Sequence, residues 1–218
     1  MMKKLLITAL VIVMGAAGLY AREAGQSSIG GRLGAAFGFH SYADTKGGLA
    51  DEMSIPANLF IHSDRMNFNF ALYGNYAVTD RLSVQTELNF MINQGYELSL
   101  LGIGMDITYS SVDIPILLKA NFLSTPSYAF GILAGPHISL PLGRASISGG
   151  GVSEEFDIDT SATFGLTTGI FSAVQAGPGR FVADLRFVFD FNAVEDMEGL
   201  AFMRRRALPI TIGYEISF

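Results

Sequence analysis

The stretch Ala207-Leu-Pro-Ile-Thr-Ile-Gly-Tyr-Glu-Ile-Ser-Phe218 decides the fold, because two kinds of residue alternate along it without a break. Even positions carry leucine, isoleucine, tyrosine or phenylalanine, and odd positions carry small or polar residues. Successive side chains of a β-strand point to opposite faces, so this stretch predicts a strand with one apolar and one polar face.

The same alternation recurs upstream, with connections of two different lengths. Short connections fall at 79–81, 123–126 and 175–180, and long ones fall at about 41–65, 93–111, 141–161 and 192–206. Short turns alternating with long loops are typical of outer-membrane barrels. The sequence therefore predicts an all-β fold, an eight-stranded antiparallel up-and-down transmembrane β-barrel. Its expected strands are 29–40, 66–78, 82–92, 112–122, 128–140, 162–174, 181–191 and 207–218.

The apolar face of these strands is expected to meet lipid, and the polar face is expected to line the lumen. Aromatic residues gather near both ends of the apolar face, as in the interfacial girdles of membrane barrels. A soluble barrel would have to expose the ionisable residues and bury all the aromatics. The predicted lumen charge network consists of Arg32, Glu87, Asp113, Lys119, Asp184, Arg186, Asp190 and Glu215.

Composition agrees with export to a membrane. Half of the 218 residues are hydrophobic and only 16% are charged, yet after the first twenty residues no apolar run is long enough for a transmembrane helix. A basic start and a short apolar core predict a cleaved signal peptide at 1–21, followed by one barrel domain at 22–218. The net charge of −6 disfavours nucleic-acid binding, and the absence of cysteine excludes disulfides and thiolate sites.

Three motifs resemble those of known proteins. Val112-Asp-Ile-Pro-Ile-Leu-Leu-Lys119 and Tyr128-Ala-Phe-Gly-Ile-Leu-Ala-Gly-Pro136 resemble the small porin-family outer-membrane β-barrel domain, an OmpA/OmpX-type barrel. The last strand resembles the C-terminal signal of outer-membrane barrels, with Tyr214 and Phe218 on one face. The resemblance implies an outer-membrane location, outer-membrane lipids as surroundings and recognition by the barrel assembly machinery.

Few residues point to chemistry. His137 and Ser139 are spaced like a pair in outer-membrane lipid A deacylases, but the alternation places both in the lumen and no carboxylate completes the set. No cofactor or metal motif occurs, and we expect the chain not to be an enzyme. Arg204, Arg205 and Arg206 precede the last strand; they are expected to contact anionic lipid headgroups or to pair with loop acids.

The leading interpretation is a structural or adhesive outer-membrane barrel, whose lumen is plugged by the charge network and whose loops bind an extracellular ligand. The alternative is a narrow porin-like or lateral-exit passage for small or apolar solutes. Eight strands enclose a space that side chains can just fill, which favours the plug.

Overall fold

The computed structural model describes residues 24–42, 61–64, 66–100, 103–125, 127–149, 152–157, 162–192 and 203–218. The predicted signal peptide at 1–21 lies outside these residues. No helix in the described part of the chain is long and apolar enough to cross a membrane. The described strands are β1 (Ser27–Tyr42), β2 (Ile61–Asp64), β3 (Met66–Ala77), β4 (Leu82–Leu100), β5 (Ile103–Ser124), β6 (Tyr128–Gly149), β7 (Val152–Asp157), β8 (Thr163–Ala176), β9 (Gly179–Asp190) and β10 (Met203–Ser217).

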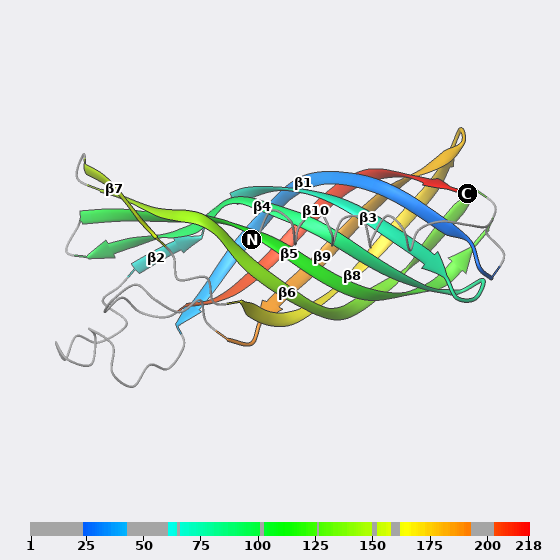
Figure 1. Ribbon diagram of the computed structural model, residues 1–218, viewed down its shortest axis with the longest axis horizontal. Coiled ribbons are helices and arrows are strands. Elements are labelled where there is room, and N and C mark those ends of the chain that lie inside the picture. The colour runs from blue at the N-terminus through cyan, green and yellow to red at the C-terminus, as the bar shows by residue number, and fades with distance from the viewer. Residues whose placement is uncertain are drawn as a thin grey trace.

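Eight of these strands close into an antiparallel barrel (Figure 1), and the predicted fold is confirmed. Each barrel strand pairs with the next one along the chain, and β10 closes the ring on β1 through an unbroken register from Ser28↔Ser217 to Tyr42↔Met203. Closure leaves no unpaired edge in the wall. The short turns and the C-terminus lie at one end of the barrel (Figure 1), which we call the short-turn end.

Side chains alternate between a packed interior and an open outer face. Along β9, for example, every even residue from Val182 to Asp190 is buried, whereas Phe181, Ala183, Leu185 and Phe187 are exposed. Leu33 and Ile212 remain 63% exposed on the outer face, although both are fully apolar. An apolar outer face around an ionised interior suits acyl chains outside, which is the arrangement of a membrane barrel.

Small and large residues alternate inside the barrel, as a narrow lumen requires. A side chain at Gly30 would collide with the Tyr73 ring, and one at Gly165 would collide with the His137 ring. Glycine on the lumen face therefore makes room for the large polar residue of the neighbouring strand.

Two of the long connections are mostly strand, which corrects the predicted loops at 93–111 and 141–161. β4 and β5 stay paired from Gln94↔Tyr109 to Leu100↔Ile103, and β6 turns back on β7. Seven further residues at about 3.4 Å each carry the β4–β5 hairpin about 24 Å beyond the barrel.

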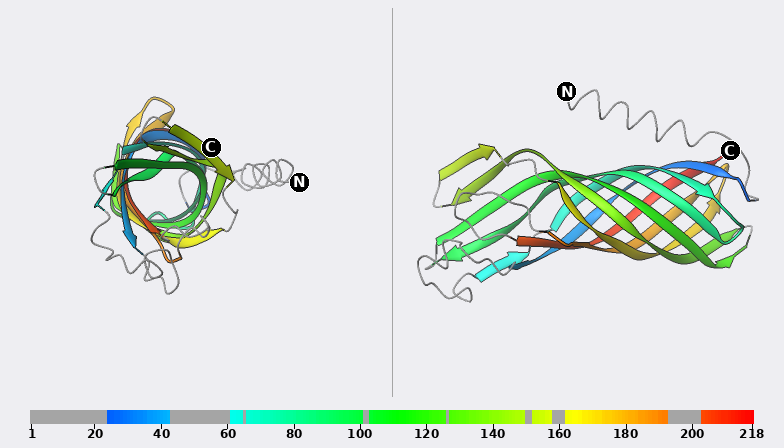
Figure 2. Two further views of the ribbon diagram at one scale, coloured as in Figure 1. Left: turned by 90° about the vertical axis from the view of Figure 1, so that its left-hand side faces the viewer. Right: turned by 60° about the horizontal axis from the view of Figure 1, so that its bottom comes forward.

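The extra strands complete a sheet beyond the barrel, ordered β2-β4-β5-β6-β7, which we call the protruding sheet (Figures 1 and 2). Its base is marked by irregular pairing: β4 has a register shift between Met91 and Gln94, where Asn93 takes a positive φ of 55°. β5 shifts between Thr108 and Ser110. Bulges of this kind bend strands, and they separate the protruding sheet from the closed wall.

Candidate functional site

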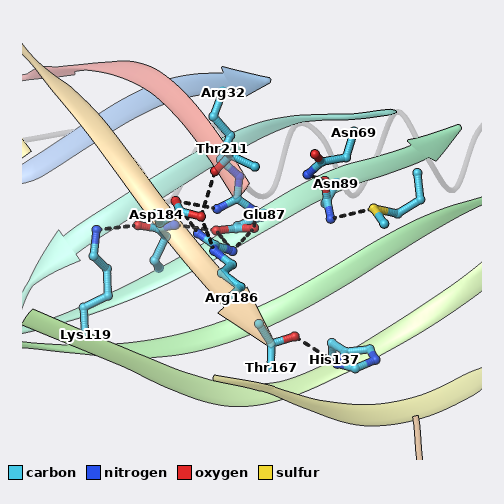
Figure 3. Close-up of polar contacts among 12 residues, drawn as sticks. Arg32, Asn69, Glu87, Asn89, Lys119, His137, Thr167, Asp184, Arg186 and Thr211 are labelled. Carbon is cyan, nitrogen blue, oxygen red and sulfur yellow. Dashed lines mark hydrogen bonds and ion pairs between the residues drawn. The ribbon is translucent and has the colours of Figure 1, made fainter. Parts of the chain in front are cut away.

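The lumen holds two arginines and two carboxylates in direct contact at mid-height, which we call the central cluster (Figure 3). Arg186 Nη1 lies 2.9 Å from both Glu87 oxygens, and its Nε donates to Asp184 Oδ1 at 2.8 Å. Arg32 donates to Asp184 Oδ2 at 3.1 Å and to Glu87 Oε2. These charges balance, as buried ions require.

Neutral groups complete the central cluster. Thr211 donates its hydroxyl to Asp184 Oδ1 at 2.7 Å, and Gln85 donates its amide to Glu87. Lys119 lies to one side (Figure 3): its Nζ donates to Gln85 Oε1 at 2.9 Å and sits 4.2 Å from the centre of the Phe171 ring. The chain of contacts thus runs from the central cluster toward the short-turn end.

A second group of charges lies nearer the protruding sheet, and we call it the outer cluster. Arg205 donates through Nε to Asp190 Oδ2 at 3.1 Å and through Nη1 to Asp113 Oδ1 at 3.2 Å and Gln94 Oε1 at 3.1 Å. Asp190 also accepts from Thr163 at 3.1 Å. Side chains of β4, β5 and β9 therefore meet at one arginine of β10.

The expected headgroup contact of Arg205 is wrong, because this side chain is only 2% exposed and points into the lumen. Arg206 faces outward and lies 5.2 Å from the centre of the Phe189 ring. The side chain of Arg204 lies outside the described residues. Arg205 has an odd number, like the polar residues of the last strand. A predicted strand that started at 205 instead of 207 would therefore have assigned its side chain to the lumen.

The structure places all eight predicted network residues in the interior, each at most 6% exposed. It adds two cations that the sequence analysis had not assigned there, Arg205 and Arg180, which is 8% exposed. Arg180 likewise extends the polar even face of 181–191 by one position. The described interior therefore holds five basic and five acidic residues, where three and five had been expected. The five bases are Arg32, Lys119, Arg180, Arg186 and Arg205.

His137 has a carboxylate partner after all, which corrects the expectation that none completes its set. Its Nε2 lies 2.8 Å from Asp190 Oδ1, and its Nδ1 lies 3.1 Å from the Thr167 hydroxyl. With the imidazole proton on Nε2, Nδ1 accepts a hydrogen bond from the Thr167 hydroxyl. The order carboxylate, imidazole, hydroxyl resembles the relay that activates a hydroxyl nucleophile. All three residues are at most 3% exposed, so the relay has no approach for a substrate and acts as packing. Ser139 is buried beside them.

A small apolar group packs inside the lumen on the side formed by three neighbouring strands, and we call it the apolar layer. Leu117, Leu133 and Phe171 point inward from β5, β6 and β8 and form one packed group, each at most 4% exposed. Ala129, Ala173 and Val182 form a second group nearer the short-turn end. These apolar side chains offer water no hydrogen-bond partner, which disfavours a continuous water path on their side of the lumen.

The two residues of the predicted assembly signal sit together at the short-turn end. Tyr214 donates its hydroxyl to the carbonyl of Ala176 at 2.8 Å and contacts the Phe181 ring edge-on at 5.2 Å. Phe218 is 45% exposed and its backbone N–H bonds to Ser27 at 3.0 Å. Their recognition by the assembly machinery stays a prediction.

Comparisons with known proteins support the fold. No known family model and no curated protein matches the sequence. Among solved structures, the outer membrane protein OprG of Pseudomonas aeruginosa is 11% identical, with 91% of this chain and 99% of that chain covered and a TM-score of 0.52. Neisserial surface protein A is 15% identical, with 87% and 97% covered and a TM-score of 0.48. Ail, the attachment invasion locus protein of Yersinia pestis, is 18% identical, with 88% and 99% covered and a TM-score of 0.41. The chain has the fold of the small outer-membrane β-barrels.

Proposed function

From the fold of a small outer-membrane β-barrel, we propose that this chain is a non-conducting barrel that presents the protruding sheet to partners outside the cell. One observation carries the proposal: strand pairing continues beyond the wall while the lumen is filled. The first barrel strand begins and the last one ends at the short-turn end, which supports a periplasmic position for that end and an external position for the protruding sheet.

The protruding sheet has long strands and two edge strands, which suit it to binding a partner. β4, β5 and β6 have 19, 22 and 22 residues, whereas β3 and β9 have 12 each and end with the wall. Within the described residues, β2 pairs only with β4 and β7 only with β6, so each offers an edge to an incoming strand. Such an edge binds an extended peptide through backbone hydrogen bonds.

A filled lumen disfavours the alternative of a passage for solutes. We expect the purified protein in planar bilayers to show no steady conductance, because the two charge clusters and the apolar layer occupy the lumen and leave no continuous water column. Single-channel recording checks this, with an empty-detergent control. Regular open-channel steps from pure protein would contradict the proposal.

The interaction role is tested by trimming the protruding sheet. Residues 95–108 and 143–161 are each replaced by a two-residue turn, which leaves the paired wall strands intact. Cells carrying the full chain are expected to adhere to a panel of immobilised matrix proteins and sulfated polysaccharides, and cells with the trimmed chain are expected to lose that adhesion. Equal adhesion of both at equal surface amounts would contradict the role. Circular dichroism of the trimmed protein shows whether the barrel is intact.

Arg206 adds a contact with lipid headgroups on the outer face of the barrel to this proposal. Its side chain is exposed, and its guanidinium lies over the Phe189 ring near the start of β10, at the end of the wall next to the long connections. An arginine there attracts anionic lipid headgroups. Of the three arginines at 204–206, we propose the headgroup contact for Arg206 alone.

A further inference from the structure

The edge that β7 (Val152–Asp157) gives to the protruding sheet can be assigned a class of partner. β7 lies at the end of the molecule opposite the C-terminus (Figure 1), and in the described part of the chain it pairs only with β6. In an edge strand, every second residue directs its N–H and C=O groups away from the sheet. Three of the six residues of β7 therefore offer backbone groups to another strand, over a length of about 20 Å.

The protruding sheet is strongly acidic. Its segments 61–64, 94–100, 103–109, 143–149 and 152–157 contain six acidic residues and one basic residue. The acidic residues are Asp64, Glu97, Asp106, Glu154, Glu155 and Asp157, and the basic residue is Arg144. Half of the acids belong to β7. This surface attracts a partner of positive charge and repels one of negative charge.

The register of the sheet gathers acids on one face. Glu97 of β4 is directly opposite Asp106 of β5, and the same row continues through β6 to Ser153 of β7. Glu155 follows two residues later and so shares the face of Ser153, and both side chains are exposed. Like charges directly opposite each other destabilise a sheet, and a cationic group beside them relieves the repulsion. The face that reaches the β7 edge thus favours cations.

The alternation along β7 sets a pattern for a strand added beside it. Positions 153, 155 and 157 carry serine, glutamate and aspartate on one face, and positions 152, 154 and 156 carry valine, glutamate and phenylalanine on the other. Side chains of opposite charge stabilise neighbouring strands, and so do pairs of apolar side chains. Basic residues at every second position, with apolar residues between them, therefore suit the strand that is added. A second copy of β7 would bring three acids to three acids and is disfavoured.

We propose that the β7 edge binds an extended segment of a partner protein that carries lysine or arginine at every second position. The inference rests on the proposed function, because it names the class of partner that the protruding sheet takes. Backbone hydrogen bonds of the added strand supply affinity, and basic side chains beside Glu155 supply specificity. Sulfated polysaccharides are excluded, because they have the wrong charge and no peptide backbone.

The test uses the full chain in an uncharged detergent and four fluorescent probes. Three are peptides of six residues: one alternates lysine and valine, one has the same residues in two blocks, and one alternates glutamate and valine. The fourth is dextran sulfate. Fluorescence anisotropy measures binding. We expect saturable binding of the alternating lysine peptide, several-fold weaker binding of the block peptide, and no binding of the glutamate peptide or dextran sulfate.

Hydrogen exchange separates strand addition from attraction by charge alone. The alternating lysine peptide is expected to slow the exchange of every second backbone amide of β7, because these N–H groups become hydrogen-bonded to the added strand. Attraction by charge alone leaves their exchange unchanged.

Two variants test the charge. Glu155→Lys reverses the charge at an exposed position of β7 and is expected to weaken binding of the alternating lysine peptide about tenfold or more. It is also expected to bind the glutamate peptide, a gain that a misfolded variant cannot show. Asp80→Lys makes the same change of charge at an exposed position of the first short turn, and binding is expected to be unchanged.

Three results would overturn the inference: no saturable binding of the alternating lysine peptide, equal weakening by Glu155→Lys and Asp80→Lys, or unchanged exchange of the β7 amides in the complex. Adhesion that is lost on trimming but is not inhibited by the alternating lysine peptide would also overturn it, and would leave the proposed function intact. Equal adhesion of the full and trimmed chains contradicts the proposed function instead, and peptide binding to the purified chain is measured independently of it.

Discussion

Replacing Glu87 with methionine is expected to lower the free energy of unfolding by about 3–5 kcal/mol, the usual result of removing one partner from a buried ion pair. Glu87 is fully buried and accepts from Arg32, Arg186 and Gln85. Without it, two guanidinium groups share the single carboxylate of Asp184. Urea unfolding of the protein in lipid bilayers, followed by circular dichroism, measures the loss.

The double variant Glu87→Met with Arg186→Met is the decisive comparison. It restores charge balance and leaves Arg32 paired with Asp184 at 3.1 Å, so we expect it to be more stable than Glu87→Met alone. Asp80→Asn, at an exposed turn position, serves as the matched control and should change stability by less than about 0.5 kcal/mol. A double variant less stable than the single one would show that the central cluster is not governed by charge balance.

Arginine at Ile212 is expected to cost about 2–4 kcal/mol, because the side chain would lie among acyl chains near the middle of the membrane. Ile212 is 63% exposed and pairs with Leu33, beside Thr211 and Arg32 of the central region. In water, the same substitution at so exposed a position would change stability by only about 0.5 kcal/mol. The prediction therefore separates a lipid-facing wall from a solvated one.

Val78→Arg provides the control for this substitution. Val78 is 49% exposed and lies next to the first short turn, at the membrane interface. Arginine there is expected to cost about 0–1 kcal/mol, since its guanidinium reaches the headgroups. The two variants are compared by urea unfolding in the same bilayers. Equal costs at Ile212 and Val78 would contradict the placement of the wall in lipid.

The outer cluster contains Arg205, whose position differs from the prediction made from the sequence. Arg205 was grouped with its sequence neighbours as a basic run, although it shares the polar parity of Thr211 and Glu215. The predicted strand begins at 207, two residues after Arg205, although the same alternation extends back to 205. The extended hairpins were missed in part for a related reason: once the strands leave the barrel, neither face is set by lipid, and their alternation weakens.

The sequence by itself determined the number of barrel strands, their order and the face of each that meets lipid. The faces follow from alternation within each strand, since a strand's two faces are defined locally, and the number and order follow from the short and long connections between the strands. Only the tertiary structure decided which charges meet. The partners of Arg205 stand 15 and 92 residues away, and those of Glu87 stand 55 and 99 residues away. Such pairs depend on the stagger of all eight strands at closure, and no single strand carries that information.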